Sequence, residues 1–392
     1  MTLKFLTAGE SHGPALMAIL EGMPAGLPIT DEIINKELLR RQRGYGAGPR
    51  MKIEKDRVRI LGGVLEGVTI GAPIALLIEN RDHTKWKGTK VEPITIPRPG
   101  HADLTGAVKY GYRDLRPALE RASARETAAR VAVGAICKHF LDQFKISVGG
   151  YVVSIGDVDA DINQIPLNER LVLAEKNDLR CPDEAAVQLM KEKIEGIIKA
   201  RDTLGGIIEV LVIGVPPGLG SHVQWDRRLE ARLGGAVLSV QAVKGVEIGT
   251  AFENTRLPGT QVQDAIRLEG KRIVRSTFDS GGLEGGITNG GPLLIRAAMK
   301  PIATTLKPQQ SVDLSSGKEV PTQYERSDFC PVPRAVPILE AMISFVVADA
   351  LIEKLGGDSI LEMKPRFGSL RKAELDDLSM DNTSHVFWSS EE

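Results

Sequence analysis

The segment from residue 117 to residue 144 reads PALERASARETAARVAVGAICKHFLDQF. Proline favours the first turn of a helix, and the apolar residues after it recur at helical spacing. The pattern predicts one continuous helix over residues 117–144 with a buried face. The residues expected on that face are Leu119, Ala122, Val131, Ile136 and Phe140. A second apolar helix is expected at 336–355, and such helices need to be covered by other elements.

The segments around these helices alternate in the way that strands do. Strands are expected at residues 3–7, within 51–80, at 148–155, at 206–215 and within 245–295, whereas 14–21 fits either a strand or a helix. Further helices are expected at 30–43, 183–200 and 225–238, and a long loop at 80–101. Regular strand–helix alternation is not evident, which disfavours a doubly wound parallel sheet. The sequence predicts one α+β domain over residues 1–370 and a loose polar tail at 371–392.

The composition excludes several classes of protein. The 392 residues include 50 Lys and Arg against 51 Asp and Glu, a balance that disfavours a nucleic-acid-binding protein. The 41 glycines are scattered rather than placed at every third position, which excludes collagen. Cys137, Cys181 and Cys330 form no CxxC pair and no HExxH occurs, so neither disulfides nor a metal site is expected. Without a secretory signal or an apolar run of about 18 residues, the chain is expected to be soluble and cytoplasmic, with no membrane contact.

The turn Gly9-Glu10-Ser11-His12-Gly13 is the first candidate for chemistry. It matches the G-x-S-x-G pattern of serine hydrolases, in which the serine follows a central strand. Few residues precede the motif, which speaks against a hydrolase, and a tight turn with a solvated His12 is a further alternative. A histidine held between glycines after a strand also suits proton transfer to a ligand.

Arginines gather around a glycine-rich loop. Arg40, Arg41 and Arg43 end a predicted helix, and Arg50 follows the loop at 44–49. Cations complement the C-terminus of a helix, but this number exceeds that need. Guanidinium groups and free backbone N–H groups suit a phosphate or a carboxylate, and a solvated charged face is the alternative.

A second basic segment begins with RPGHAD at residues 98–103, where a Pro-Gly turn fixes the backbone before His101. In the helix that follows, Arg121 and Arg125 are four residues apart and are expected to share one face. Like charges at that spacing repel each other, and an anion between them would offset the repulsion. The small residues at 122–124 leave room for a flat or bulky ligand.

Two segments in the C-terminal half are less specific. Residues 281–291 read GGLEGGITNGG, which fits neither the Walker A pattern nor the Rossmann fingerprint, so a role in turns alone stays open. Asp328 follows Arg326 by two residues and fits a structural salt bridge, and Cys330 is expected to be a packed thiol. Together these residues predict an enzyme that acts on a phosphorylated, acidic small molecule by histidine acid–base chemistry.

Several of these motifs resemble those of the chorismate synthase family. The resemblance covers about residues 3–370 and rests on GESHG at 9–13, EGMP at 21–24, RPGHAD at 98–103, ERASARET at 120–127, QAVKGVE at 241–247 and RSDF at 326–329, running on to Glu340. It implies helices sandwiched between antiparallel β-sheets and a homotetramer. It also implies anti-1,4-elimination of phosphate from 5-enolpyruvylshikimate 3-phosphate to give chorismate, the last step of the shikimate pathway. Reduced FMN is required in the family although no net redox change occurs.

The resemblance also implies roles for individual residues. His12 would protonate or hydrogen-bond the reduced flavin, His101 would assist the departing phosphate as a general acid, and Asp328 would act with flavin N5 in removing the ring proton. The anionic groups of the substrate would be bound by Ser11, Arg41, Arg50 and Arg125. The flavin would be bound by Arg121, Ala122, Ser123, Gln241, Ala242, Gly285, Lys300, Pro301, Ile302, Ala303, Thr304 and Arg326.

The chain departs from the family pattern at Ala47, where relatives usually carry an arginine. In the family that arginine helps to bind an anion, and NADP is often assigned there together with Arg41. Its replacement by alanine weakens the case for NADPH as a ligand and is expected to lower substrate affinity. NADPH is therefore expected only as a reductant of the flavin.

Overall fold

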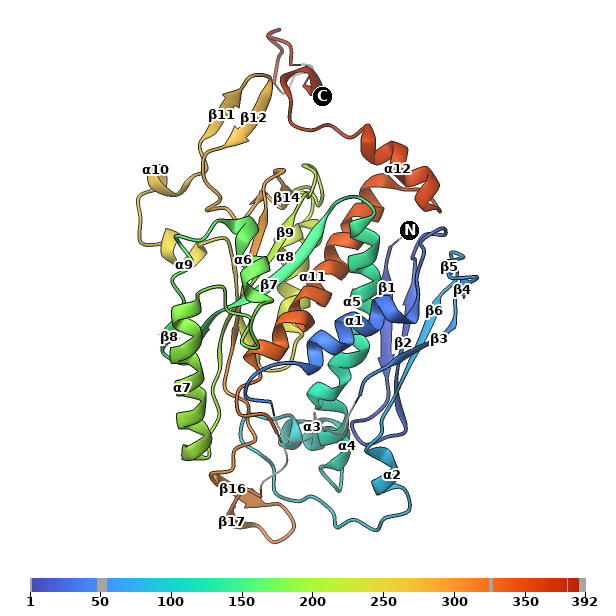
Figure 1. The fold of residues 1–392 in the computed structure, drawn as a ribbon, viewed down its shortest axis with the longest axis vertical. Coiled ribbons are helices and arrows are strands. Elements are labelled where there is room, and N and C mark those ends of the chain that lie inside the picture. The colour runs from blue at the N-terminus through green and yellow to red at the C-terminus, as the bar shows by residue number, and fades with distance from the viewer. Residues whose placement is uncertain (1, 48–54, 324–326, 379, 388–392) are drawn as a thin grey trace.

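Two antiparallel sheets enclose a layer of helices in the computed structural model, which describes residues 2–47, 55–323, 327–378 and 380–387 (Figure 1). The four-stranded sheet has the order β1-β2-β6-β3, formed by β1 (Lys4–Ala8), β2 (Ala15–Glu21), β6 (Ile74–Glu79) and β3 (Val58–Gly62). The five-stranded sheet has the order β10-β15-β9-β7-β8, formed by β10 (Val243–Ile248), β15 (Leu293–Met299), β9 (Gly206–Ile213), β7 (Ser147–Ile155) and β8 (Val158–Asp159). The predicted α+β class, with helices between antiparallel sheets, is confirmed.

The middle layer holds α1 (Asp31–Gln42), α5 (Thr127–Asp142) and α11 (Val332–Leu355), and α8 (Leu229–Leu238) packs on α11. Figure 1 shows α5 and α11 crossing between the two sheets. A Cβ added at Gly134 would lie 2.2 Å from the Cβ of Ala341, so the helices approach at a glycine. Buried apolar residues from both sheets and from these helices form one continuous main cluster, and a second, smaller cluster includes Tyr151 on β7 and Leu211 on β9.

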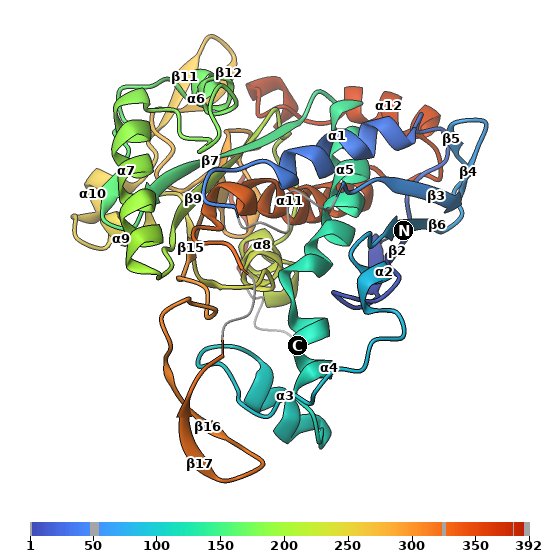
Figure 2. The same cartoon turned by 60° about the horizontal axis from the view of Figure 1, so that its bottom comes forward.

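The remaining elements lie around the sandwich. The other α-helices are α2 (His83–Trp86), α3 (Asp103–Tyr110), α4 (Arg116–Ala122), α6 (Leu167–Ala174), α7 (Glu184–Ala200), α9 (Ala251–Asn254), α10 (Gly259–Val262) and α12 (Ile360–Gly368). The small hairpins are β4 (Val64–Leu65) with β5 (Val68–Thr69), β11 (Ile266–Glu269) with β12 (Arg272–Arg275), β13 (Leu283–Glu284) with β14 (Ile287–Thr288), and β16 (Gln310–Asp313) with β17 (Lys318–Pro321). Figure 2 shows α3, α4 and the β16–β17 hairpin together below the end of α5.

The prediction of one continuous helix over 117–144 is wrong. Helix α4 ends at Ala122, Ser123 is extended at φ −61° and ψ 140°, a short 3₁₀ turn covers Ala124–Glu126, and α5 begins at Thr127. The side chain of Ser123 accepts a hydrogen bond from the Arg125 backbone N–H, a local bond that competes with the helical ladder. Arg121 and Arg125 therefore lie on opposite sides of a break and do not share a helix face.

Other elements differ from the prediction in extent. The apolar helix expected at 336–355 begins at Val332, and α12 follows it. Residues 14–21, left open between strand and helix, form β2, and the expected loop at 80–101 contains the short helix α2. Within the described residues α11 is long and apolar enough to cross a membrane, with a mean hydropathy of 2.0, contrary to the expectation that no such run exists. Because 89% of that window is buried inside the protein, α11 has the character of a core helix.

Candidate active site

The turn between β1 and β2 holds His12 against α4. The two oxygens of Glu120 accept hydrogen bonds from the His12 backbone N–H and ring Nδ1, each at 2.7 Å. Trp86 lies against the imidazole with a ring-centroid distance of 4.6 Å. Burial raises the pKa of Glu120, but the hydrogen bonds from His12 outweigh burial and hold that pKa below its ordinary value. An ionised carboxylate only accepts hydrogen bonds, so Nδ1 of His12 carries the proton that it donates to Glu120.

His101 has the same kind of support. Its Nδ1 lies 2.6 Å from Oδ1 of Asp103, a carboxylate that is 1% exposed. Arg98 donates from Nε to Asp103 Oδ2 at 2.8 Å and from Nη2 to Oδ1 at 3.0 Å. Burial raises the pKa of Asp103, but the bonds from His101 and Arg98 lower it well below its ordinary value. The ring Nδ1 of His101 is thus held by an anion, as that of His12 is.

Ser11 is 2% exposed, its backbone N–H donates to the Glu120 carbonyl oxygen, and Ser123 donates to its hydroxyl at 3.2 Å. The motif lies in the turn of an antiparallel β1–β2 hairpin, whereas the nucleophile elbow of a hydrolase joins a strand to a helix and exposes its serine. The geometry therefore argues against the serine-hydrolase alternative.

Two of the arginines expected to bind anions, Arg41 and Arg125, meet on one buried carboxylate. Asp56, whose side chain is 0% exposed, accepts from Arg125 Nη1 at 2.5 Å and from Arg41 Nη1 at 3.3 Å. Asp328 is engaged by Arg334, whose Nε donates to the Arg41 carbonyl oxygen at 3.2 Å. We call these five residues the site-side cluster: Arg41, Asp56, Arg125, Asp328 and Arg334.

Asn80 links this cluster to the His12 turn. Its amide oxygen accepts from Arg125 Nε at 2.9 Å, and its amide nitrogen donates to the carbonyl oxygens of Glu10 and Gly13 at 3.0 and 2.8 Å. Arg121 also holds the start of the turn by donating to Thr7 and Gly9. Arg125, Arg121 and the His12 turn are thus parts of one hydrogen-bonded unit.

A second chain of contacts joins His101 to the same cluster. Arg98 donates to Thr304 Oγ1 at 2.9 Å, and Ser327, next to Asp328 in the sequence, donates to the Thr304 carbonyl oxygen at 2.9 Å. Lys300 donates to the carbonyl oxygen of Gly100, beside His101, at 3.3 Å. Asp328, His12 and His101, which are far apart in the sequence, therefore border a common region.

The segment 300–304, expected to bind the flavin, lines a cavity of about 410 Å³. Pro99 from the His101 loop, Lys300, Pro301, Ile302 and Ala303 all contribute to its wall. Ala242 adopts a positive φ of 66°, and its carbonyl oxygen accepts from the Lys300 backbone N–H, which places Gln241 and Ala242 beside that segment.

The residues present fit a flavin. Gln241 Oε1 is buried and has no hydrogen-bond partner within the described ranges, so it offers an acceptor to a ring N–H. Ala122 and Ser123 are small and partly exposed where α4 ends, which leaves room for a flat ring. Lys300, Pro301, Ile302 and Ala303, which line the cavity, could hold such a group together with the neighbouring Gln241.

Some expected residues are not brought together. Gly285 lies in the β13–β14 hairpin, where an added Cβ would lie 4.0 Å from the Cβ of His222. In Figure 1 β14 lies above the middle of the long axis, beside β9 and α8, whereas α3 and α4 lie in the lower part. Arg50, Arg326 and the last two residues of the glycine loop at 44–49 lie outside the described residues.

Within the described ranges no group of three or more His, Cys, Asp or Glu side chains could hold a metal ion.

Comparison with known proteins decides the family. A family model described as chorismate synthase matches residues 3–352. The chorismate synthase of Aquifex aeolicus (strain VF5) is 52% identical over 383 residues, covering 93% of this chain and 96% of that protein. The chorismate synthase of Pelobacter propionicus is 51% identical over 383 residues, covering 93% of this chain and 97% of that protein. The chain belongs to the chorismate synthase family.

A solved crystal structure of a chorismate synthase agrees with this assignment. It matches with a TM-score of 0.78 and 46% sequence identity, covering 94% of this chain and 97% of that chain. The predicted family is therefore confirmed, and with it the expected class of enzyme, a lyase of the shikimate pathway.

The structure adds supporting residues that the chorismate synthase motifs alone did not single out. Asp103 stood inside RPGHAD, and its spacing of two residues from His101 was a usable signal. Glu120 begins the ERASARET motif at 120–127, where the sequence assigns it no role, and it proves to hold His12. Asp56 and Asn80 carried no sequence signal, because single polar residues beside strands are common and their partners are distant in the chain.

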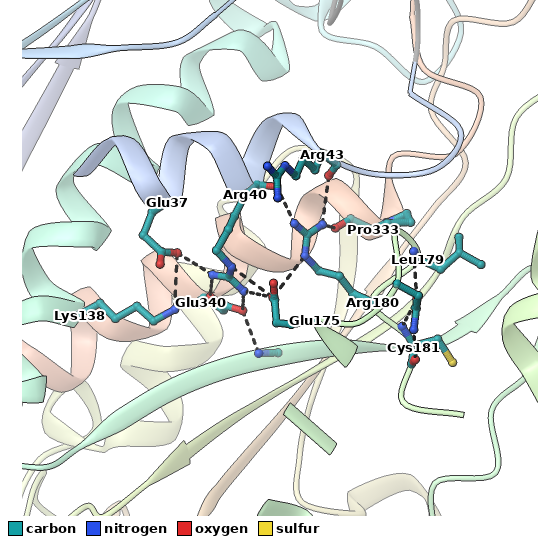
Figure 3. A network of polar contacts seen from close by, with 12 residues as sticks. Glu37, Arg40, Arg43, Lys138, Glu175, Leu179, Arg180, Cys181, Pro333 and Glu340 are labelled. Atoms are coloured by element: carbon teal, nitrogen blue, oxygen red, sulfur yellow. Dashed lines mark hydrogen bonds and ion pairs between the residues drawn. The ribbon is translucent and has the colours of Figure 1, made fainter. Parts of the chain in front are cut away.

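The larger cavity of this chorismate synthase family member lies elsewhere. It measures about 470 Å³ and is lined by Glu37, Arg40, Lys138, His139 and Glu175 among other residues. Figure 3 shows these charges engaging one another around Glu340, which is 1% exposed. Arg40 and Lys138 donate to Glu340 at 2.5 and 2.8 Å, so the polar groups of this cavity are largely satisfied from within the chain. We call this set the core-side cluster: Glu37, Arg40, Lys138, Glu175, Arg180 and Glu340.

Proposed function

We propose that this chain converts 5-enolpyruvylshikimate 3-phosphate to chorismate by anti-1,4-elimination of phosphate. The observation that carries the proposal is the single hydrogen-bonded unit that joins two carboxylate-held histidines to a pair of buried arginines. Phosphate and carboxylate groups match guanidinium donors, and imidazole groups held at Nδ1 by carboxylates suit proton transfer. Membership of the chorismate synthase family supports the same reaction.

We further propose how the residues divide the work. Arg41 and Arg125, with Ser11 and Arg50, would bind the anionic groups of the substrate. His101, fixed through Nδ1 by Asp103, would present Nε2 to the departing phosphate and give it a proton. Asp328 would accept the ring proton on the other side of the substrate.

Reduced FMN would be held by the residues expected from the family pattern, with Gln241 and the 300–304 segment nearest to the cavity. When bound, the reduced flavin supplies electron density transiently as the phosphate leaves, with no net oxidation. His12 would keep a proton at the flavin through the ring nitrogen that Glu120 does not hold. NADPH would serve only to reduce the flavin, because Ala47 replaces the arginine usual in relatives.

We also propose the extent of the catalytic unit, the compartment and the assembly of the protein. The catalytic unit would span residues 1–370, with residues 371–392 as an appended tail. The protein would act in the cytoplasm as a homotetramer, with a small-molecule substrate and no nucleic-acid partner.

The test is an anaerobic assay of chorismate and phosphate release with chemically reduced FMN. Both products should appear in equal amounts, and oxidised FMN with NADPH should give little turnover unless a separate flavin reductase is added. His101→Ala should lower kcat by about 10²-fold or more, because general acids commonly contribute that much. Absence of both products from the wild-type protein with reduced FMN would refute the proposed reaction.

A further inference from the structure

Asp56 is the shared partner of two buried arginines. Its Oδ1 accepts from Arg125 at 2.5 Å and its Oδ2 from Arg41 at 3.3 Å. The side chains of Arg125 and Arg41 are only 3% and 4% exposed. The single negative charge of Asp56 can neutralise only one of these two buried guanidinium groups. A buried charge that is not neutralised lowers the stability of the folded protein.

The rest of the site-side cluster does not remove this excess. Asp328 is the other carboxylate that faces Arg41, and it is engaged by Arg334, which itself lies against Arg41. Among the described residues, three guanidinium groups of this cluster therefore face two carboxylates, which leaves one positive charge in excess. The remaining donors of Arg41 go to neutral acceptors, the hydroxyl of Thr127 and the carbonyl oxygen of Ala124.

One donor of this cluster is unused. Arg125 Nη2 is buried and has no hydrogen-bond partner within the described residues, although Nε and Nη1 of the same group are bonded to Asn80 and Asp56. A buried N–H of a charged group without an acceptor is rare in folded proteins and marks a place for a ligand oxygen. The electrostatics agree: burial lowers the pKa of Arg41 to about 9, Arg334 and Arg125 add to that effect, and Asp56 and Asp328 oppose it.

We propose that Asp56 is a positioning residue that acts as an internal counter-ion: it holds Arg41 and Arg125 side by side in the free protein and leaves one positive charge for an incoming phosphate or carboxylate group. The inference rests on the proposed function only for the identity of the substrate anion. A salt bridge that served structure alone would leave neither an excess charge nor an unused donor.

The test uses Asp56→Asn with inorganic phosphate as the probe. Without phosphate the variant should have a lower Tm than the wild type, because two buried guanidinium groups lose their shared anion. Added phosphate should raise its Tm by more than it raises that of the wild type, since a bound anion stabilises the folded state by mass action. The phosphate Kd should fall by about tenfold or more, as expected when a nearby like charge is removed from an anion site.

The matched control is Asp349→Asn. Asp349 forms a partly buried ion pair with Arg232 at 2.6 Å, on α11 and α8 outside the site. This variant should also lose stability, but phosphate should shift its Tm no more than that of the wild type. Equal phosphate shifts in wild type, Asp56→Asn and Asp349→Asn would overturn the proposal.

A second variant covers failure of Asp56→Asn to fold. Arg125→Met keeps Asp56 paired with Arg41 and removes the unused donor, so the phosphate-dependent Tm shift should be largely lost. Retention of the full wild-type shift in Arg125→Met would equally overturn the proposal. If the wild type forms chorismate but the phosphate-dependent Tm shifts of the variants differ from those predicted, only the proposed role of Asp56 would be refuted. The expected shifts without chorismate formation would refute only the proposed reaction.

Discussion

Arg40 and Arg41 are neighbours in the last turn of α1, yet they enter opposite environments. Arg40 points into the core-side cluster, where Glu340, Glu37 and Glu175 accept its hydrogen bonds at 2.5, 2.6 and 2.5 Å (Figure 3). Burial alone would lower the pKa of Arg40, but these carboxylates, Glu340 above all, raise it above its ordinary value. Arg41 shares one carboxylate with Arg125, and burial lowers its pKa to about 9.

The difference teaches how one helix end can serve both stability and binding. Successive helical residues point about 100° apart, so adjacent arginines reach different layers of the sandwich. Where carboxylates match the cations, the cluster fastens α1, α5, α11 and β7 together, because Glu340 also accepts from the Gly150 N–H at 2.9 Å. Where cations exceed carboxylates, the cluster is prepared for an anion from outside.

The largest expected effect comes from breaking the core-side cluster at its centre. Glu340→Gln should lower the free energy of unfolding by about 3–5 kcal/mol, because it leaves Arg40 and Lys138 without their shared buried anion. Chemical denaturation measures this directly. Glu37→Gln, at a 14% exposed carboxylate of the same cluster, is the matched control and should cost clearly less. Equal losses in the two variants would contradict the central place of Glu340.

On the site side the main effect should fall on turnover. Asp328→Asn keeps the shape of the side chain and removes a proton acceptor, so kcat should fall by about 10²-fold, equivalent to about 3 kcal/mol. Anaerobic steady-state assays with reduced FMN measure kcat. The free energy of unfolding should change less than in Glu340→Gln. A near-normal kcat would remove Asp328 from the proposed mechanism.

A smaller effect concerns pH. Burial opposes ionisation of Glu340, but Lys138 and Arg40 outweigh burial and lower its pKa from 4.5 to about 2. A lowered folded-state pKa means that the stabilisation is complete above pH 4.5 and is lost as the pH falls toward 2. The difference in unfolding free energy between wild type and Glu340→Gln should therefore shrink by about 1 kcal/mol between about pH 5 and 3.5. Denaturant titrations across that range measure it, and a constant or growing difference would contradict the assignment.

The elements of the two clusters were predictable from sequence to different degrees. Most strands of both sheets follow from alternation, except that the pattern leaves β2 open between a strand and a helix, and the apolar stripe of α5 follows from helical spacing. The break at Ser123 was not predictable from that stripe, because alanine and serine continue the helical pattern. What stabilises the break includes the ion pair of Arg125 with Asp56, which lies 69 residues away in the chain.

The candidate site shows the same division. His12 and His101 stand in glycine or Pro-Gly turns, a local signal that the sequence displays. No local pattern predicts that Arg40 and Arg41 lie in different clusters, because this depends on where the fold places Glu340 and Asp56. Local patterns thus predict that arginines gather near the site. Tertiary packing determines which of them carry a positive charge that no carboxylate neutralises.

The most direct test compares Arg40→Met with Arg41→Met, measuring Tm and kcat/KM for 5-enolpyruvylshikimate 3-phosphate with reduced FMN. Arg41→Met should lower kcat/KM by about 10²-fold, since loss of a charged hydrogen-bonding partner commonly costs 2–5 kcal/mol, while Tm changes little. Arg40→Met should lower Tm by about 5 °C or more while kcat/KM stays within about threefold. Parallel losses of activity and stability in both variants would contradict the division of the two arginines.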